Sequence, residues 1–292
     1  MLLCQPLSDS EICPPDVLLV LCLSKLLFNV PLHALPVGEE PLSSKCPVMY
    51  CYSSNMLGQA TSPRTFKRME STKGSLTFFE NPTDDSPAGA KSANHYRRQY
   101  FVQSTTTKDL FLQTAPSSDI IHFHGHVITD EHPLNHEMIF HGPTPLQTRE
   151  VFALNLGKHN PLVKLIGCGS GREKIGTSDE SLGFISSFLL AGESAVLGTM
   201  WAIHDRPSGA AFSKSFYEIS EKMTDVAANG GGESDFRAEN TIDLARRLRK
   251  AALRYEPTQL PQPGPTGLDL CVWGMEIPFV TRLWHYDCSP FE

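Results

Sequence analysis

The sequence predicts an α/β fold in which a mostly parallel sheet carries helices on both faces. Strand-like and helix-like segments alternate along most of the chain, which is the pattern of βαβ units. Two of the predicted helices have one apolar face; in residues 177–192 this face holds Leu182, Ile185, Phe188 and Leu189. With 292 residues, of which 40% are hydrophobic and 20% charged, the chain can bury a large core.

The first third of the chain predicts strands and a long surface loop. The apolar run 17–23 predicts a buried strand, and after a turn the segment LLFNVPLHAL predicts a second short strand. PVMYCYSS, at residues 47–54, is a further strand candidate. Residues 60–95 are rich in Pro, Gly, Ser, Thr and Asp, so we expect a surface loop around the short strand SLTFF.

Beyond residue 100 the alternation becomes regular. Residues 105–115 begin with threonines that can cap a helix. Thr177 and Glu180 form a capping box for a later helix, and Gly192 closes that helix. The segments after residue 118 are predicted as strand 119–125, helix 147–156, strand 161–169, helix 177–192, strand 194–203, helix 207–223, loop 226–239, helix 240–255, and a Pro-rich connector with closing strands over 260–283.

Composition and charge exclude several functions. The net charge of −7 argues against nucleic-acid binding, and the basic cluster at 246–254 fits the solvated face of a helix. The apolar run near the N-terminus follows acidic residues and is split by Lys25, so it predicts neither a signal peptide nor a membrane span. The 8 cysteines occur singly, without a Cys-x-x-Cys pair. We therefore expect an intracellular, cytoplasmic protein whose thiols are mostly reduced.

Two predicted strands end in reactive residues. HFHGH, at 122–126, has histidines at alternate positions, which would share one face of a strand. Cys168 lies in the glycine-rich run 167–171, where backbone amides can converge on an oxyanion. Alone, such a cysteine is usually a small core residue, and a buried histidine usually has a structural role. The spacing from His126 to Cys168 fits one crossover between parallel strands, so together they predict a Cys/His dyad.

A zinc-dependent hydrolase that uses the HFHGH histidines is the alternative. His-x-His pairs on a strand bind zinc, and His132, His136 and His141 follow closely. However, the hydrolase pattern His-x-His-x-Asp-His is not matched, and no Asp or Glu lies between the histidines. We therefore predict no metal and no cofactor.

Four blocks of sequence occur in a fixed order: VPLHALPVGEEPLSSKCPVMYCYSS, DIIHFHGH, LIGCGSG and GFISSFLLAGESAVLGTMWAIHDRPSGAAFSKSFYE. In this order the chain resembles the CHAT domain, the caspase-like module of clan CD cysteine peptidases related to separase, in its fungal form. The resemblance runs from about residue 17 to residue 284 and implies a three-layer caspase-like fold. The expected division is an N-terminal extension over 1–16, the CHAT domain over 17–287 with surface loops at about 60–95 and 226–239, and a tail over 288–292.

The resemblance implies a cysteine endopeptidase that cleaves protein or peptide substrates with a His/Cys dyad. His126 is then the base that deprotonates Cys168, and amides near Gly167 and Val127 hold the oxyanion. Val127 departs from the family, in which glycine usually follows this histidine. His124, which does precede a glycine, is the alternative base in a shifted register.

The strand 194–203 is expected beside the Cys168 strand, because a single crossover connects the two. Its end would bring Trp201, His204 and Asp205 to the rim of the dyad. Relatives often favour a basic residue before the scissile bond, using an acid at the pocket floor. Asp205 is therefore either this acid, with Trp201 or His204 as a wall of the pocket, or the cap of the next helix.

A second function, from a different class, is a catalytically silent caspase-like module that serves as an interaction scaffold. The departure at Val127 motivates it, and so does the start of the chain almost inside the fold, where relatives often carry helical repeats upstream. The expected partners are a protein or peptide substrate and a regulatory partner in place of such repeats, with no nucleic acid and no membrane.

Overall fold

An eight-stranded sheet forms the centre of the computed structural model. The structure describes residues 17–23, 25–37, 40–52, 75–80, 97–157, 162–176, 181–193, 195–200, 212–219, 245–251 and 279–283. In the order in which they lie side by side, the strands are β1 (Leu19–Cys22), β4 (Val48–Cys51), β15 (Phe279–Leu283), β14 (Ala195–Thr199), β11 (Leu162–Ile166), β7 (Ile120–His124), β5 (Ser75–Glu80) and β6 (Arg97–Val102). The strands from β14 to β6 are all parallel, whereas β15 is antiparallel to β14.

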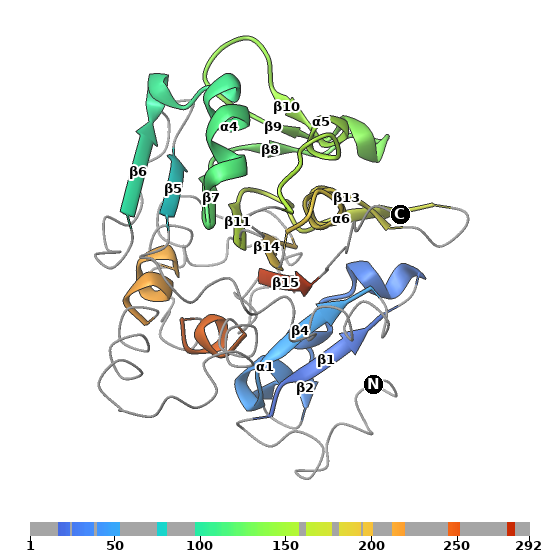
Figure 1. Cartoon of the computed structure of the whole chain (residues 1–292). Helices are drawn as coiled ribbons and strands as arrows, with labels where there is room; N and C mark the ends of the chain where they lie inside the picture. The colour runs from blue at the N-terminus through green and yellow to red at the C-terminus, as the bar shows by residue number, and fades with distance from the viewer. Residues whose placement is uncertain are drawn as a thin grey trace, which may run out of the picture.

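Helices cover both faces of the sheet, which gives three layers (Figure 1). On one face, Val163 and Leu165 of β11 pack in a core with α4 (Lys108–Thr114), α5 (Thr148–Val151) and α6 (Phe184–Leu190). On the other face, Ile166 and Leu197 pack in a core with the helices 212–219 and 245–251. Alternate strand residues thus serve opposite cores. The predicted α/β class, with a mostly parallel sheet between two helical layers, is confirmed.

The helix boundaries are confirmed in part. Thr107 caps α4 as predicted, because its hydroxyl accepts a hydrogen bond from the Leu110 N–H at 3.3 Å. The helix α6 begins only at Phe184, after a strand β13 (Ser181–Gly183), so it starts later than the capping-box residues predicted. Those residues lie outside the described part of the chain. Gly192 closes α6 as predicted, with a φ of +108° that favours glycine.

The N-terminal third departs furthest from the predictions. LLFNVPLHAL forms two 3₁₀ helices, η2 (Lys25–Asn29) and η3 (Leu32–Ala34), where we predicted a strand. Pro31 lies between them, and a proline provides no N–H for a sheet. β1 is a half-exposed edge strand and is therefore not buried as predicted. β5 was expected as a short strand within a surface loop, but it lies buried between β7 and β6, and β6 itself was not predicted.

Short elements connect this framework. They are β2 (Pro36–Val37), β3 (Glu40–Pro41), α1 (Leu42–Lys45), η4 (Gln103–Thr105), η5 (Ala115–Ser117), β8 (Val127–Ile128), η6 (Pro133–Asn135), β9 (Glu137–Met138), β10 (Leu146–Gln147) and β12 (Glu173–Ile175). The expected extension 1–16, most of the loop 60–95, the loop 226–239 and the tail 288–292 lie outside the described residues. Among the described helices, none is long and apolar enough to cross a bilayer.

Glu193, next to the turn at Gly192, is a buried carboxyl group. It is 0% exposed, and neither carboxylate oxygen has a hydrogen-bond partner within the described residues. Burial raises the pKa of Glu193 well above its ordinary value of 4.5. The folded state therefore keeps a proton that the unfolded chain loses, so this contribution to stability is complete at low pH and is lost as the pH rises above about 4.5.

We expect the Glu193→Gln variant to lose less stability than the wild type between pH 5 and pH 8, because glutamine imitates the protonated acid and does not ionise. Thermal melts followed by circular dichroism across this range measure the difference. Glu131→Gln, at an exposed position, is the matched control and should keep the wild-type pH dependence. An unchanged pH dependence in Glu193→Gln would show that Glu193 does not titrate in this way.

Candidate active site

The strands β7 and β11 end side by side at the same edge of the sheet. They pair in parallel up to His124 and Ile166, and the Gly125 N–H continues the ladder by donating to the Ile166 carbonyl at 3.0 Å. His126 and Cys168 each follow two residues after this last pair. Both are half-buried, whereas the residues on either side of each are buried. The structure therefore brings the predicted base and nucleophile to adjacent strand ends.

A tight turn carries Cys168. Within it, the Ser170 N–H donates to the Gly167 carbonyl at 3.1 Å, and the Arg172 N–H donates to the Gly169 carbonyl at 2.9 Å. Gly169 has a φ of +65°, in the left-handed region that favours glycine. The glycine after Cys168 thus allows the chain to reverse directly beyond the thiol.

The neighbouring strand β14 fixes this turn. The Thr199 hydroxyl donates to the Gly167 carbonyl, and the Thr199 N–H donates to Ser170 Oγ at 3.0 Å. Ser170 Oγ in turn donates to the Leu165 carbonyl at 2.9 Å, and the Gly171 N–H donates to the Thr199 carbonyl at 2.7 Å. Thr199 and Ser170 are therefore positioning residues that hold the cysteine turn against β14.

Gly167 lies where the two strand ends approach each other closely. A Cβ at this position would lie 2.7 Å from the Gly125 carbonyl oxygen and 2.7 Å from Val127 Cγ2. The side chain of Val127 occupies the space that a larger residue at 167 would need. The valine that departs from the family pattern is accommodated because its neighbour is glycine.

The backbone N–H of Val127 is not used in the ladder between β8 and β9. Val127 faces Met138 across β8 and β9, and the Ile139 N–H donates to the His126 carbonyl at 3.0 Å. In an antiparallel ladder this pattern makes Val127 and Met138 a non-hydrogen-bonded pair, so the Val127 N–H points away from β9. Its φ is negative, as a side chain requires. The backbone conformation at this position therefore does not require a glycine.

The predicted alternative base, His124, does not lie beyond the strand ends. His124 is 2% exposed and is the last residue of β7, so the alternation expected for three histidines holds only for His122 and His124. Trp201, His204 and Asp205 lie outside the described residues. The strand before them, β14, does lie beside β11 as predicted.

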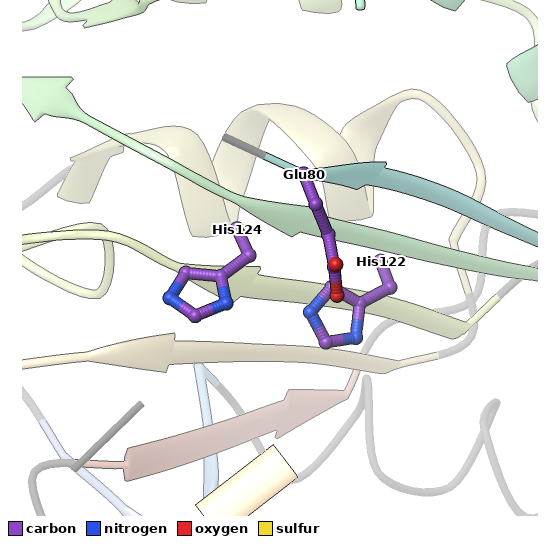
Figure 2. Close-up of side chains that lie close together, drawn as sticks. All are labelled: Glu80, His122 and His124. Atoms are coloured by element: carbon purple, nitrogen blue, oxygen red, sulfur yellow. The ribbon is translucent and has the colours of Figure 1, made fainter. Parts of the chain in front are cut away.

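Sequence reasoning missed a buried polar group on the face covered by helix 212–219. It comprises Glu80, Lys164 and Tyr217 together with His122 and His124 (Figure 2 for the acid and the histidines). The only signal in the sequence was the alternation of the HFHGH histidines, because the acid and the lysine come from other strands. The alternative of a zinc-dependent hydrolase is not favoured at this buried group, since side chains exposed by 2% or less offer no access to a substrate.

A cysteine and a histidine at the ends of adjacent parallel strands, in a sheet covered on both faces, are the arrangement of the caspase-like class. The model of the CHAT domain family matches residues 2–228, more than half of the chain. The protein therefore belongs to the CHAT domain family, as the sequence blocks predicted. Its membership of a fungal form of this family stays a prediction.

Two solved structures with TM-scores above 0.5 show the same fold. Two crystal structures of the Saccharomyces cerevisiae separase–securin complex match with TM-scores of 0.51 and 0.52 at 15% identity, covering 83% and 82% of this chain. The chain spans only 14% of the separase chain in each. The Arg-specific cysteine proteinase gingipain R matches with a TM-score of 0.47 at 11% identity, covering 82% of this chain and 54% of its own. No curated protein matches the chain in sequence.

Proposed function

We propose that this protein is a cysteine endopeptidase of the caspase and separase type, with Cys168 as nucleophile and His126 as base. One observation carries the proposal: both residues follow the paired ends of β7 and β11 by the same number of residues. The half-buried state of both side chains supports it, because the residues around them are buried. A purely structural cysteine would be expected to be sealed by the core.

The mechanism follows from these positions. His126 takes the proton of the Cys168 thiol, and the thiolate attacks the carbonyl carbon of the peptide bond. The negative charge that develops on the carbonyl oxygen is held by the Val127 amide and by amides of the turn that begins at Gly167. The imidazolium of His126 then protonates the leaving amine, and water releases the acyl group from sulfur in the second half of the reaction.

Substrate selection is proposed for the residues that follow β14. Because β14 adjoins β11, its carboxyl end opens toward the same edge of the sheet as Cys168. Asp205 follows this end by a few residues, and a carboxylate there would favour a basic residue before the scissile bond. Trp201 or His204 would form a wall of this pocket.

The decisive experiment is covalent labelling with a peptide that carries a thiol-reactive group after an Arg residue. We expect the probe to label the wild type at Cys168 and not to label Cys168→Ala. Cys22→Ala is the matched control, because Cys22 is exposed and its loss should leave the labelling unchanged. Mass spectrometry of the labelled peptide identifies the site.

The same experiment tests the pocket and the competing function. A probe with Ala in place of Arg should react more slowly with the wild type, and Asp205→Asn should remove this preference without changing thermal stability, since Asn caps helices about as well as Asp. Equal labelling of wild type and Cys168→Ala, or failure of every peptide to label Cys168, would favour the silent interaction module. The reason to test this second function is Val127, which stands where the family usually has a glycine.

A protein partner that regulates the site is also proposed. The separase structures that share this fold contain securin, so a caspase-like module of this kind can be held by another protein. The partner of this chain would act at the rim of the proposed dyad.

A further inference from the structure

A compact group of metal-ligand side chains lies on the face of the sheet covered by helix 212–219. Glu80, His122 and His124 each offer one ligand atom, and these atoms all lie within 4.8 Å of one another. None of the three residues is more than 2% exposed. Figure 2 shows the three side chains on the same side of β5 and β7, with the Glu80 carboxylate directed toward His122. The register explains this, because Glu80 pairs with His124 and His122 shares the face of His124.

His122 is oriented as a metal ligand would be. Its Nδ1 lies 2.8 Å from the Tyr217 hydroxyl, a contact that fixes the orientation of the ring. Its Nε2 is buried and has no hydrogen-bond partner within the described residues. Metal-binding histidines commonly use one ring nitrogen for the metal and give the other to such a partner. With the proton on Nδ1, Nε2 carries the lone pair that a metal needs.

Glu80 is oriented by a second tyrosine, because the Tyr100 hydroxyl donates to Glu80 Oε2 at 2.7 Å. A carboxylate that accepts a hydrogen bond on one oxygen can still bind a metal through the other. Both ligand types therefore have an orienting neighbour.

Lys164 provides the alternative way to balance the charge of Glu80. Its Nζ is buried, and it lies 5.2, 4.6 and 4.5 Å from the ring centroids of Phe212, Phe216 and Tyr217. Burial lowers the pKa of Lys164 well below its ordinary value, while Glu80 raises it. The aromatic rings favour the ammonium form, whereas burial favours the neutral amine. A metal and an ammonium group would compete for the same carboxylate.

We propose that Glu80, His122 and His124 form a binding site for a divalent transition metal, with Zn²⁺ as the ion that suits two imidazoles and one carboxylate. The metal would link the last residue of β5 to the last residue of β7. It would thereby fix the strand end from which Gly125 and His126 continue to the candidate active site.

The test is the metal content of the full chain. We expect protein expressed with added zinc and purified through a weak chelator to retain one equivalent of Zn²⁺, and Co²⁺ in its place to give visible d–d absorption bands. Glu80→Gln and His122→Gln should each lose the metal or bind it at least 100-fold more weakly. Tyr217→Phe, which keeps all three ligands, should weaken binding by about 10- to 100-fold.

Two further variants separate this site from its alternatives. Cys168→Ala should keep the full equivalent, so a loss of metal in this variant would place the ion at the proposed dyad and overturn the proposal. Lys164→Met should also keep the metal. Absence of zinc from the wild type would overturn the proposal, and the charge of Glu80 would then be balanced by Lys164. If the ligand variants do not fold, the zinc content of the wild type and the metal affinity of Tyr217→Phe still test the proposed site. None of these measurements requires peptidase activity, so they do not depend on the proposed function.

Discussion

Replacement of His126 by glutamine is expected to lower kcat/KM for peptide cleavage by about 10²- to 10⁴-fold, the usual contribution of a general base. Glutamine fills a similar volume at this half-buried position but cannot take the thiol proton. The thermal midpoint should remain close to that of the wild type, because His126 lies beyond the end of β7. Initial rates with a fluorogenic peptide, together with a thermal melt, measure both effects.

His141→Gln is the matched control for this prediction. His141 is exposed, and its described bond is made by its backbone N–H to the Thr106 carbonyl, which the substitution leaves in place. We expect its kcat/KM to equal that of the wild type. If His126→Gln cleaves at the wild-type rate, His126 is not the base, and the alternative register with His124 would require this buried side chain to turn toward Cys168.

The Gly167→Ala variant is expected to be destabilised by about 1–3 kcal/mol, as overpacked positions are, and to lose about 10²-fold of its labelling rate at Cys168. The added methyl group would lie 2.7 Å from the Gly125 carbonyl oxygen, so the end of β7 must move away from the cysteine turn. That movement displaces His126, which follows Gly125 directly. Thermal melts and the rate of probe labelling measure the two effects.

Gly157→Ala is the control for the loss of a glycine as such, because a Cβ there would lie 3.9 Å from its nearest neighbour. We expect it to change neither stability nor labelling. Adding Val127→Ala to Gly167→Ala should restore part of the stability, since it removes the contact with Val127 Cγ2 but not the one with the carbonyl. Wild-type stability in Gly167→Ala alone would mean that the two strand ends are not packed as described.

The central sheet and the proposed dyad could be predicted because their signals are local. The strands β7, β11 and β14 are short apolar runs ending in chemically distinctive residues, and the crossovers between them have the length that parallel neighbours require. The positions of His126 and Cys168 at adjacent strand ends follow from that order alone. The residues that follow β14 were predicted as substrate contacts, and this stays a prediction.

The buried polar group could not be predicted, because it is assembled from separate strands. Glu80 is the last residue of a strand in a polar region that we expected to be a surface loop. The neighbouring residues in the sequence do not indicate that Glu80 is buried. Lys164 looks like the exposed residue of a strand, but its strand is covered on both faces. The contacts within the buried polar group depend on which strands pair and in which register, and no periodic pattern in the sequence indicates that pairing.

The position of β15 has a consequence for the order in which the chain can fold during synthesis. This strand lies between β4 and β14, so the pair β1 and β4 joins the rest of the sheet only through a segment more than 200 residues later in the chain. The five parallel strands that carry His126 and Cys168 can associate earlier, because their partners are closer in sequence. Contacts of such long separation form slowly. On the ribosome, the N-terminal strands must therefore wait, unpaired with the rest of the sheet, until residues 279–283 have emerged.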